Sequence, residues 1–446
     1  MKRFSVIVIT LSILLSACGK ADTATADIPA AVPIAAEVSE EATPTEAPSE
    51  EVVILDMPGF DTIEETPADE ESVIASAEPP RVDGIEVTNE MRDYAVIREG
   101  NTQRLKDVMR RAAKGEVITL GYLGGSITAG SNADPMETSC YAYLTTEWWK
   151  QAFPNADIRY GNAGIGATDS YIGVHRVDDD LLWAKPDVIV VEFSVNDALP
   201  INQETYDSLL LHLLKHDNSP AVVPLIICSD SHCYVGEHLP VIESYDLPAI
   251  SYYSLLYANY VSWDMVGSPD MIHPVNTGHQ LIAHILTNYY LHVLASMDEE
   301  GEEYTIPEEH LTAARFENAD ILYNDDITPT SSEGFENADP DNPILHGNGW
   351  ITKEAGSISF ELDCRTLGIA YLEYGEEPEG GSAVMDIYVD DELAATVDPS
   401  KGKSRRLVYE NCLLTDSAAH HTVRIEASDK NKGGKVFELV GLTVGY

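Results

Sequence analysis

Apolar residues recur in the middle of the chain as short runs that alternate with segments of helical spacing. Four runs are rich in β-branched or aliphatic residues, over 117–123, from 158 onward, over 187–193 and over 222–228. Segments with the apolar spacing of helices lie before and between them, over 102–113, 139–153, 169–183 and 204–216. This alternation predicts an α/β domain over residues 81–305, with a parallel sheet between two layers of helices.

After residue 305 the pattern changes to short segments in which apolar and polar positions alternate. Turn residues separate these segments, which lie over 356–362, 368–374, 383–389, 421–426 and 436–444. The pattern predicts an all-β sandwich, similar to a jelly roll, over residues 306–446. Its aromatic residues Trp350, Tyr371 and Tyr374 could either stack on sugars or belong to the core of the domain.

The first 18 residues have the pattern of a signal peptide. Lys2 and Arg3 precede an apolar run over 4–15, which is too short to span a bilayer. The run ends in Leu-Ser-Ala-Cys, which resembles a bacterial lipobox and implies a lipid on Cys18. A plain secretory signal with a chance cysteine is the alternative. We expect an exported protein, held by acyl chains at the extracytoplasmic face of the cell membrane.

Residues 19–80 are rich in Ala, Glu, Pro, Thr and Ser, and Lys20 is the one basic residue among them. Low hydrophobicity combined with like charge predicts a disordered linker. The whole chain has 446 residues and a formal net charge of -48. Such a charge excludes nucleic acid as a partner, because phosphate binding requires clustered Lys and Arg. It leaves the lipid anchor as the expected membrane attachment.

Five cysteines follow Cys18, so at least one of them has no partner within the chain. The sequence leaves open a pair between Cys228 and Cys233 and another pair between Cys364 and Cys412. The segment over 228–238 also contains two histidines, but its spacing fits no zinc pattern. We expect neither a metal nor a cofactor.

The first motif that could carry chemistry is Gly-Gly-Ser-Ile-Thr, with Ser126 at its centre, directly after an apolar strand. A serine at the tip of such a turn can expose its hydroxyl while nearby N–H groups face a developing oxyanion. Phosphate-binding turns share this form, but the Lys-Ser/Thr ending of a P-loop is absent. The Gly-x-Ser-x-Gly elbow is absent too, since Thr128 replaces its second glycine.

Three further motifs follow in the chain. The segment 162–168 (Asn-Ala-Gly-Ile-Gly-Ala-Thr) follows the second strand, Asn196 closes the third, and Asp270 precedes His273 by three residues. That last spacing lets Asp accept from one ring nitrogen while the other faces a serine as general base. Taken singly, each motif also has a structural explanation, as a glycine turn, a strand-end cap or a core histidine.

Together, in this order, the four motifs resemble those of the SGNH/GDSL hydrolase superfamily, in its Gly-Gly-Ser-Ile-Thr subgroup. The resemblance covers residues 100–295 and implies a three-layer αβα, flavodoxin-like fold. It also implies that Ser126 is the nucleophile, His273 the general base and then acid, and Asp270 the residue that orients His273. The oxyanion hole would use Ser126, Asn196 and a backbone N–H of the glycine loop.

Two positions depart from the family pattern. Gly125 stands where many members have Asp, and Ala167 stands where many have the glycine that completes the oxyanion hole. We predict Gly166, one residue earlier, as the donor.

The resemblance implies a serine esterase, and an exported one favours acylated carbohydrate as the substrate, with acetyl as the acyl group. A lipid or thioester acyl hydrolase is one alternative. A non-catalytic, glycan-binding surface lipoprotein is another. Oligomeric state is not set by the sequence.

Overall fold

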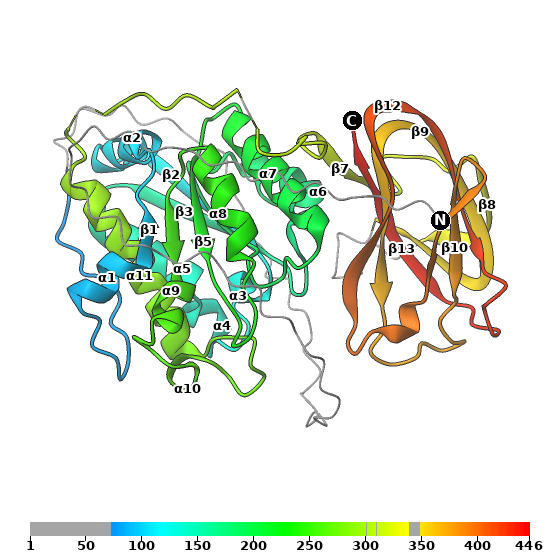
Figure 1. The fold of residues 1–446 in the computed structure, drawn as a ribbon, viewed down its shortest axis with the longest axis horizontal. Helices are drawn as coiled ribbons and strands as arrows, with labels where there is room; N and C mark the ends of the chain where they lie inside the picture. Colours follow the sequence, from blue (N-terminus) through cyan, green and yellow to red (C-terminus); the bar gives the residue numbers. More distant parts are fainter. Residues whose placement is uncertain (1–72, 300, 309, 339–347) are drawn as a thin grey trace, which may run out of the picture. The chain divides into compact units, whose positions relative to one another are not determined.

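The computed structural model describes residues 73–299, 301–308, 310–338 and 348–446 (Figure 1). An α/β domain is followed by an all-β domain, as the sequence predicts. The expected signal peptide, the lipidation site at Cys18 and most of the expected linker lie outside the described residues. Within the described ranges, no helix is both long and apolar enough to cross a membrane.

The α/β domain is built on a six-stranded sheet, in which every strand but one runs parallel to its neighbours. The parallel strands are β2 (Val117–Gly124), β3 (Asp157–Gly164), β4 (Val188–Glu192), β5 (Ala221–Ile226) and β6 (Ala249–Ser251). β1 (Val96–Arg98) pairs antiparallel with β6 at the edge. The order β1-β6-β5-β4-β2-β3 gives the parallel strands the flavodoxin-like arrangement.

Two layers of helices cover the sheet (Figure 1). One contains α2 (Gln103–Ala113), α5 (Tyr141–Ala152) and α11 (Asn276–Ala295), and the other α6 (Ser170–Asp180), α7 (Pro200–Lys215) and α8 (Val235–Ser244). The shorter helices are α1 (Asn89–Ala95), α3 (Ser126–Ala129), α4 (Met136–Ser139), η1 (Leu182–Ala184), α9 (Tyr252–Tyr257) and α10 (Trp263–Val266). Because both faces are covered, β4 and β5 are buried throughout, which explains their continuous apolar runs.

Helix boundaries differ from the predicted ones where local capping decides them. The helix predicted over 204–216 begins at Pro200, a residue whose fixed φ suits the first turn. The side chain of Asn202 accepts the N–H of Leu199 at 2.7 Å and so fixes this earlier start. The helix predicted over 139–153 is divided at Cys140, whose extended backbone separates α4 from α5.

The folded part of the chain begins earlier than the predicted linker boundary at residue 80. The N–H of Val73 donates to the carbonyl of Ala113 at 2.8 Å. The indole N–H of Trp148 donates to the carbonyl of Ala77, which is itself buried. Residues 73–80 therefore pack on the α/β domain, and their assignment to the linker is corrected.

The all-β domain is built on one seven-stranded sheet, with β11 and β7 at the two ends of the strand order. Its strands are β7 (Ala319–Leu322), β8 (Ser331–Asn337), β9 (Trp350–Glu373), β10 (Met385–Val389), β11 (Glu392–Val397), β12 (Arg406–Ala427) and β13 (Phe437–Gly445), with η2 (Pro399–Lys401) before β12. In β13, Leu439 pairs with Trp350 near the start of β9 and with Tyr371 near its end. β9 therefore bends back and encloses a core that includes Ile358, Phe360, Ile387, Ile425 and Leu442.

Two expectations about this domain need correction or completion. The predicted strands 356–362 and 368–374 form the single strand β9, because Cys364 and Thr366 point into buried positions instead of making a turn. The aromatic residues that could have stacked on sugars are buried, with exposed fractions of 2% for Trp350, 7% for Tyr371 and 6% for Tyr374. Trp350 and Tyr371 belong to the core of the domain, and Tyr374 belongs to the buried cluster that also contains residues of α6, α7 and α8.

All five cysteines in the described ranges are free thiols. Neither of the pairs that the sequence left open is formed. Cys364 is fully buried in the core of the all-β domain, and the Cys233 thiol donates to the carbonyl of Ile227.

Candidate active site

Ser126 lies where a parallel sheet of this order binds its ligands. It follows the carboxyl end of β2 after a single residue, Gly125, and begins α3. The strand order reverses at β2, which has β3 on one side and β4 on the other. Crevices outside the carboxyl ends of strands at such a point are the usual ligand sites of these folds. Ser126 is 8% exposed there.

The structure brings Ser126, His273 and Asp270 into a chain of hydrogen bonds. The Ser126 hydroxyl lies 2.7 Å from Nε2 of His273. Nδ1 of the same ring lies 2.7 Å from Oδ2 of Asp270. The side chain of His273 is 14% exposed and that of Asp270 35%. This arrangement lets an imidazole accept the serine proton while a carboxylate stabilises the ring in one tautomer.

Besides the His273 ring, four donors hold the Asp270 carboxylate in place. Its Oδ1 accepts the N–H groups of Ile272 and His273, at 2.8 and 2.9 Å, and the hydroxyl of Ser268. Its Oδ2 accepts from the Asn132 amide at 2.9 Å as well as from the His273 ring. Partial burial acts to raise the pKa of Asp270, but the hydrogen bonds from Ser268 and His273 outweigh it and hold this pKa well below its usual value.

The sequence did not single out Asn132 or Ser268. Neither belongs to a motif, and each reaches Asp270 from a loop: Asn132 follows α3, and Ser268 follows α10. Asn132 also has a positive φ of 63°, which asparagine tolerates better than most residues. That single preference is the only local signal in the sequence.

The side chain of Asn196 lies against the turn that carries Ser126. A Cβ placed on Gly125 would lie 2.5 Å from Oδ1 of Asn196, closer than real contacts allow. A side chain at 125, as in the Gly-Asp-Ser form of the motif, would therefore require the Asn196 amide to shift from this position.

The glycine loop also lies beside Ser126. A Cβ placed on Gly166 would lie 3.9 Å from the Cβ of Ser126. The turn is closed by the Thr168 hydroxyl, which donates to the carbonyl of Ile165 at 2.8 Å. Ala167 has a φ of 59°, the left-handed conformation that glycine adopts with least strain. A side chain at position 166 would thus point toward Ser126, and the next residue, Ala167, holds the turn in a left-handed conformation.

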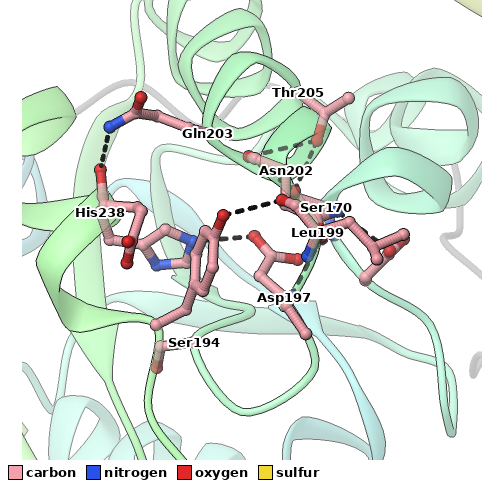
Figure 2. A network of polar contacts seen from close by, with 12 residues as sticks. Ser170, Ser194, Asp197, Leu199, Asn202, Gln203, Thr205 and His238 are labelled. Atoms are coloured by element: carbon pink, nitrogen blue, oxygen red, sulfur yellow. Dashed lines mark hydrogen bonds and ion pairs between the residues drawn. The ribbon is translucent and has the colours of Figure 1, made fainter. Parts of the chain in front are cut away.

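A buried polar network surrounds Asp197, the residue that follows Asn196 in the chain (Figure 2). Asp197 accepts the N–H of Ser170 at 2.8 Å through Oδ1 and lies 2.8 Å from Nε2 of His238 through Oδ2. Its backbone carbonyl lies 2.7 Å from Nε2 of His232. Burial raises the pKa of Asp197 and lowers that of His238, so both shifts favour uncharged forms. The network ties the turn of Asn196 to the N-terminus of α6.

These contacts also account for the histidines near Cys228 and Cys233, since both histidines bond to Asp197. No cluster of three or more His, Cys, Asp or Glu side chains that could hold a metal ion occurs within the described ranges. His279, three residues into α11, is buried, and its Nε2 lies 3.1 Å from the carbonyl of Ser131. Burial lowers its pKa to about 4, so it serves as a neutral structural residue.

Glu192 closes β4 underneath the two turns that carry Ser126 and Asn196. It is fully buried. Burial raises the pKa of its carboxyl to about 8, and backbone N–H groups of Val195 and Gly125 offset this only in part. The residue is therefore mostly protonated at neutral pH.

Comparison with known proteins finds similarity at the level of structure. No protein-family model matches the chain, and no curated protein matches its sequence. It is similar to a two-domain esterase active on acetylated mannans, co-crystallised with mannopentaose, at 29% identity and a TM-score of 0.69. That match covers 79% of this chain and 97% of the other. A second structure of a two-domain esterase active on acetylated mannans matches at 28% identity, a TM-score of 0.70, and coverage of 79% and 98%.

The extent of this match matters for the architecture. The α/β domain makes up only about half of the chain, so a match over 79% includes the all-β domain as well. Both the α/β fold and its combination with an all-β domain are therefore shared with those two structures.

Proposed function

We propose that this chain is a serine esterase that removes small acyl groups, acetyl foremost, from carbohydrate. The observation that carries the proposal is the hydrogen-bonded series Ser126, His273 and Asp270 beside the Asn196 amide and the Gly166 loop. Nucleophile, base and orienting carboxylate in this geometry are the requirements of acyl transfer.

In the first step, the Ser126 oxygen attacks the ester carbonyl carbon and His273 Nε2 takes the hydroxyl proton. The carbonyl oxygen becomes an oxyanion that accepts from the N–H groups of Ser126 and Gly166 and from the Asn196 amide. The tetrahedral intermediate then collapses. The bond to the sugar oxygen breaks, and the proton on His273 passes to that oxygen as the alcohol leaves.

In the second step, water attacks the acyl-Ser126 ester and gives its proton to His273. The second intermediate collapses to the free acid, and the proton returns to the serine oxygen. Asp270 remains ionised throughout, because its four donors favour the carboxylate, and it stabilises the imidazolium that forms twice per turnover.

Two observations support carbohydrate as the substrate. The similar structures are of an esterase active on acetylated mannans, and the similarity includes the all-β domain as well as the α/β domain. The basic and apolar residues of the expected signal peptide favour export. A polysaccharide is a substrate that an exported enzyme meets outside the cell.

The test is deacetylation of a panel of acetylated polysaccharides, mannan included, with Ser126→Ala as the control. We expect acetate release by the wild type and none by the folded variant. A series of nitrophenyl esters from acetate to decanoate separates the alternatives. A preference for long chains would favour a lipid hydrolase, and no hydrolysis at all would favour a glycan-binding protein.

We also propose that the protein is exported and anchored through Cys18. In a bacterial host, wild-type protein should partition into the detergent phase of a membrane extract. Cys18→Ala should appear in the aqueous phase. Equal partitioning of the two proteins would favour a plain secretory signal.

A further inference from the structure

Asp169 links the glycine loop to α6. It follows Thr168 directly, and its Oδ1 accepts the N–H of Ile172, so it caps the first turn of the helix. Its Oδ2 accepts the Asn202 amide at 3.0 Å. Any movement of Asp169 would be passed on to Gly166, three residues away in the same tight turn.

The all-β domain supplies another donor to the same oxygen. The hydroxyl of Tyr409, in β12, donates to Oδ2 of Asp169 at 2.8 Å, across 240 residues of sequence. Burial raises the pKa of Asp169 to about 6, and the nearby Asp197 adds to this, whereas the hydrogen bonds from Tyr409 and Asn202 act in the opposite direction. Tyr409 therefore stabilises the ionised carboxylate that accepts at both oxygens.

The ring of Tyr409 is fixed by packing. It stacks on Tyr171 of α6 with centroids 3.9 Å apart and an angle of 8° between the planes. The Tyr171 hydroxyl in turn lies 2.9 Å from the hydroxyl of Thr443 in β13. The Tyr409 hydroxyl is thus held on Asp169 by contacts with the first turn of the same helix.

We propose that Tyr409 of the all-β domain is a positioning residue for the oxyanion loop, acting through Asp169. The inference rests on the proposed function, in which Gly166 donates to the oxyanion. If Tyr409 acts in this way, the all-β domain contributes to the rate of ester hydrolysis, independently of any contact that it makes with a glycan.

Tyr171→Phe is the matched control for Tyr409→Phe. Each variant removes one tyrosine hydroxyl that bonds between the two domains and leaves the stacked rings in place, but only Tyr409→Phe removes a donor from Asp169. With nitrophenyl acetate, which needs no glycan contact, we expect Tyr409→Phe to lower kcat about tenfold with KM within about twofold. Tyr171→Phe should leave both within about twofold.

A double-mutant cycle tests the route through Asp169. Asp169→Asn can keep the acceptor for Ile172 but places an amide nitrogen, which cannot accept, toward Tyr409. We expect Tyr409→Phe to cause no further loss of kcat in this background. If Tyr409→Phe lowers kcat by the same factor in the Asp169→Asn background as in the wild type, Tyr409 does not act through Asp169. This result would overturn the inference.

Amide hydrogen exchange gives a readout that does not depend on activity. Peptides covering residues 163–173 should exchange faster in Tyr409→Phe than in Tyr171→Phe, with equal melting temperatures. Equal protection in the two variants would overturn the inference even if Ser126→Ala confirms the esterase. Faster exchange together with an active Ser126→Ala variant would contradict the proposed function, while the effect of Tyr409 on the order of the loop would stand.

Discussion

The Ser126 hydroxyl and Nε2 of His273 lie 2.7 Å apart, although 147 residues separate them in the sequence. Ser126 is placed by the end of β2, and His273 by the loop that precedes α11. The distance is within the range that proton transfer requires. The proposed base and nucleophile are thus already in contact in the described structure.

The first prediction concerns Asp270. Asp270→Asn should lower kcat by about 10³- to 10⁴-fold, because an amide cannot stabilise the imidazolium. The measurement is kcat for nitrophenyl acetate at constant pH. Asp230→Asn is the control. The side chain of Asp230 is exposed, and its backbone N–H donates to the carbonyl of Met271, the residue after Asp270. This variant should leave kcat unchanged. A loss of less than tenfold in Asp270→Asn would remove the residue from its role.

The second prediction concerns Gly125. Gly125→Ala should displace the Asn196 amide, since its Cβ would lie 2.5 Å from Oδ1. We expect kcat to fall by about 10- to 100-fold, part of the contribution of one oxyanion donor. Gly236→Ala, in α8, is the control because a Cβ there meets no atom within 4 Å. Equal kcat in both variants would contradict the placement of Asn196.

The third prediction concerns Ala167 and its φ of 59°. Ala167→Gly should keep kcat within about twofold and change the free energy of unfolding by less than about 1 kcal/mol, because relief of strain is offset by a freer unfolded chain. Ala167→Val should lose activity, because β-branched residues strongly disfavour this conformation. Ala198→Val, at a nearby exposed position without a positive φ, is the control. Full activity in Ala167→Val would argue against a fixed loop.

The fourth prediction concerns the pH dependence of stability. Because the pKa of Glu192 is raised to about 8 in the folded state, the native protein binds the extra proton between pH 5 and 8, and stability falls as pH rises through this range. Glu192→Gln removes that contribution. Its melting temperature relative to wild type should therefore increase from pH 5 to pH 8. A constant difference across this range would show that Glu192 is ionised in the folded protein.

The sequence predicts the α/β domain well because strands buried on both faces leave continuous apolar runs, as in β4 and β5. The same feature locates Ser126 and Asn196, which directly follow such runs. In the all-β domain the pattern is less informative. The sequence pattern predicts a turn at Cys364 and Thr366, which the structure places within β9. Their burial depends on pairing with β12, which is distant in sequence, so no local pattern indicates it.

The supporting residues of the site are harder to predict for the same reason. Asn132 and Ser268 reach Asp270 from loops, and the loop conformation depends on the folded surroundings rather than on apolar spacing. The contact between Tyr409 and Asp169 joins two domains, and no local pattern marks either residue. The left-handed backbone of Ala167 is also missed, since alanine ordinarily indicates the opposite conformation.

The protonated carboxyl of Glu192 has a consequence for the rate as well as for the fold. In the proposed reaction, negative charge develops on an oxygen directly above the turns that Glu192 supports. A neutral carboxyl beneath these turns does not oppose that charge, whereas an ionised one would repel it across a short path of low dielectric. Alkaline conditions would thus add a like charge under the oxyanion hole, which would oppose the developing oxyanion.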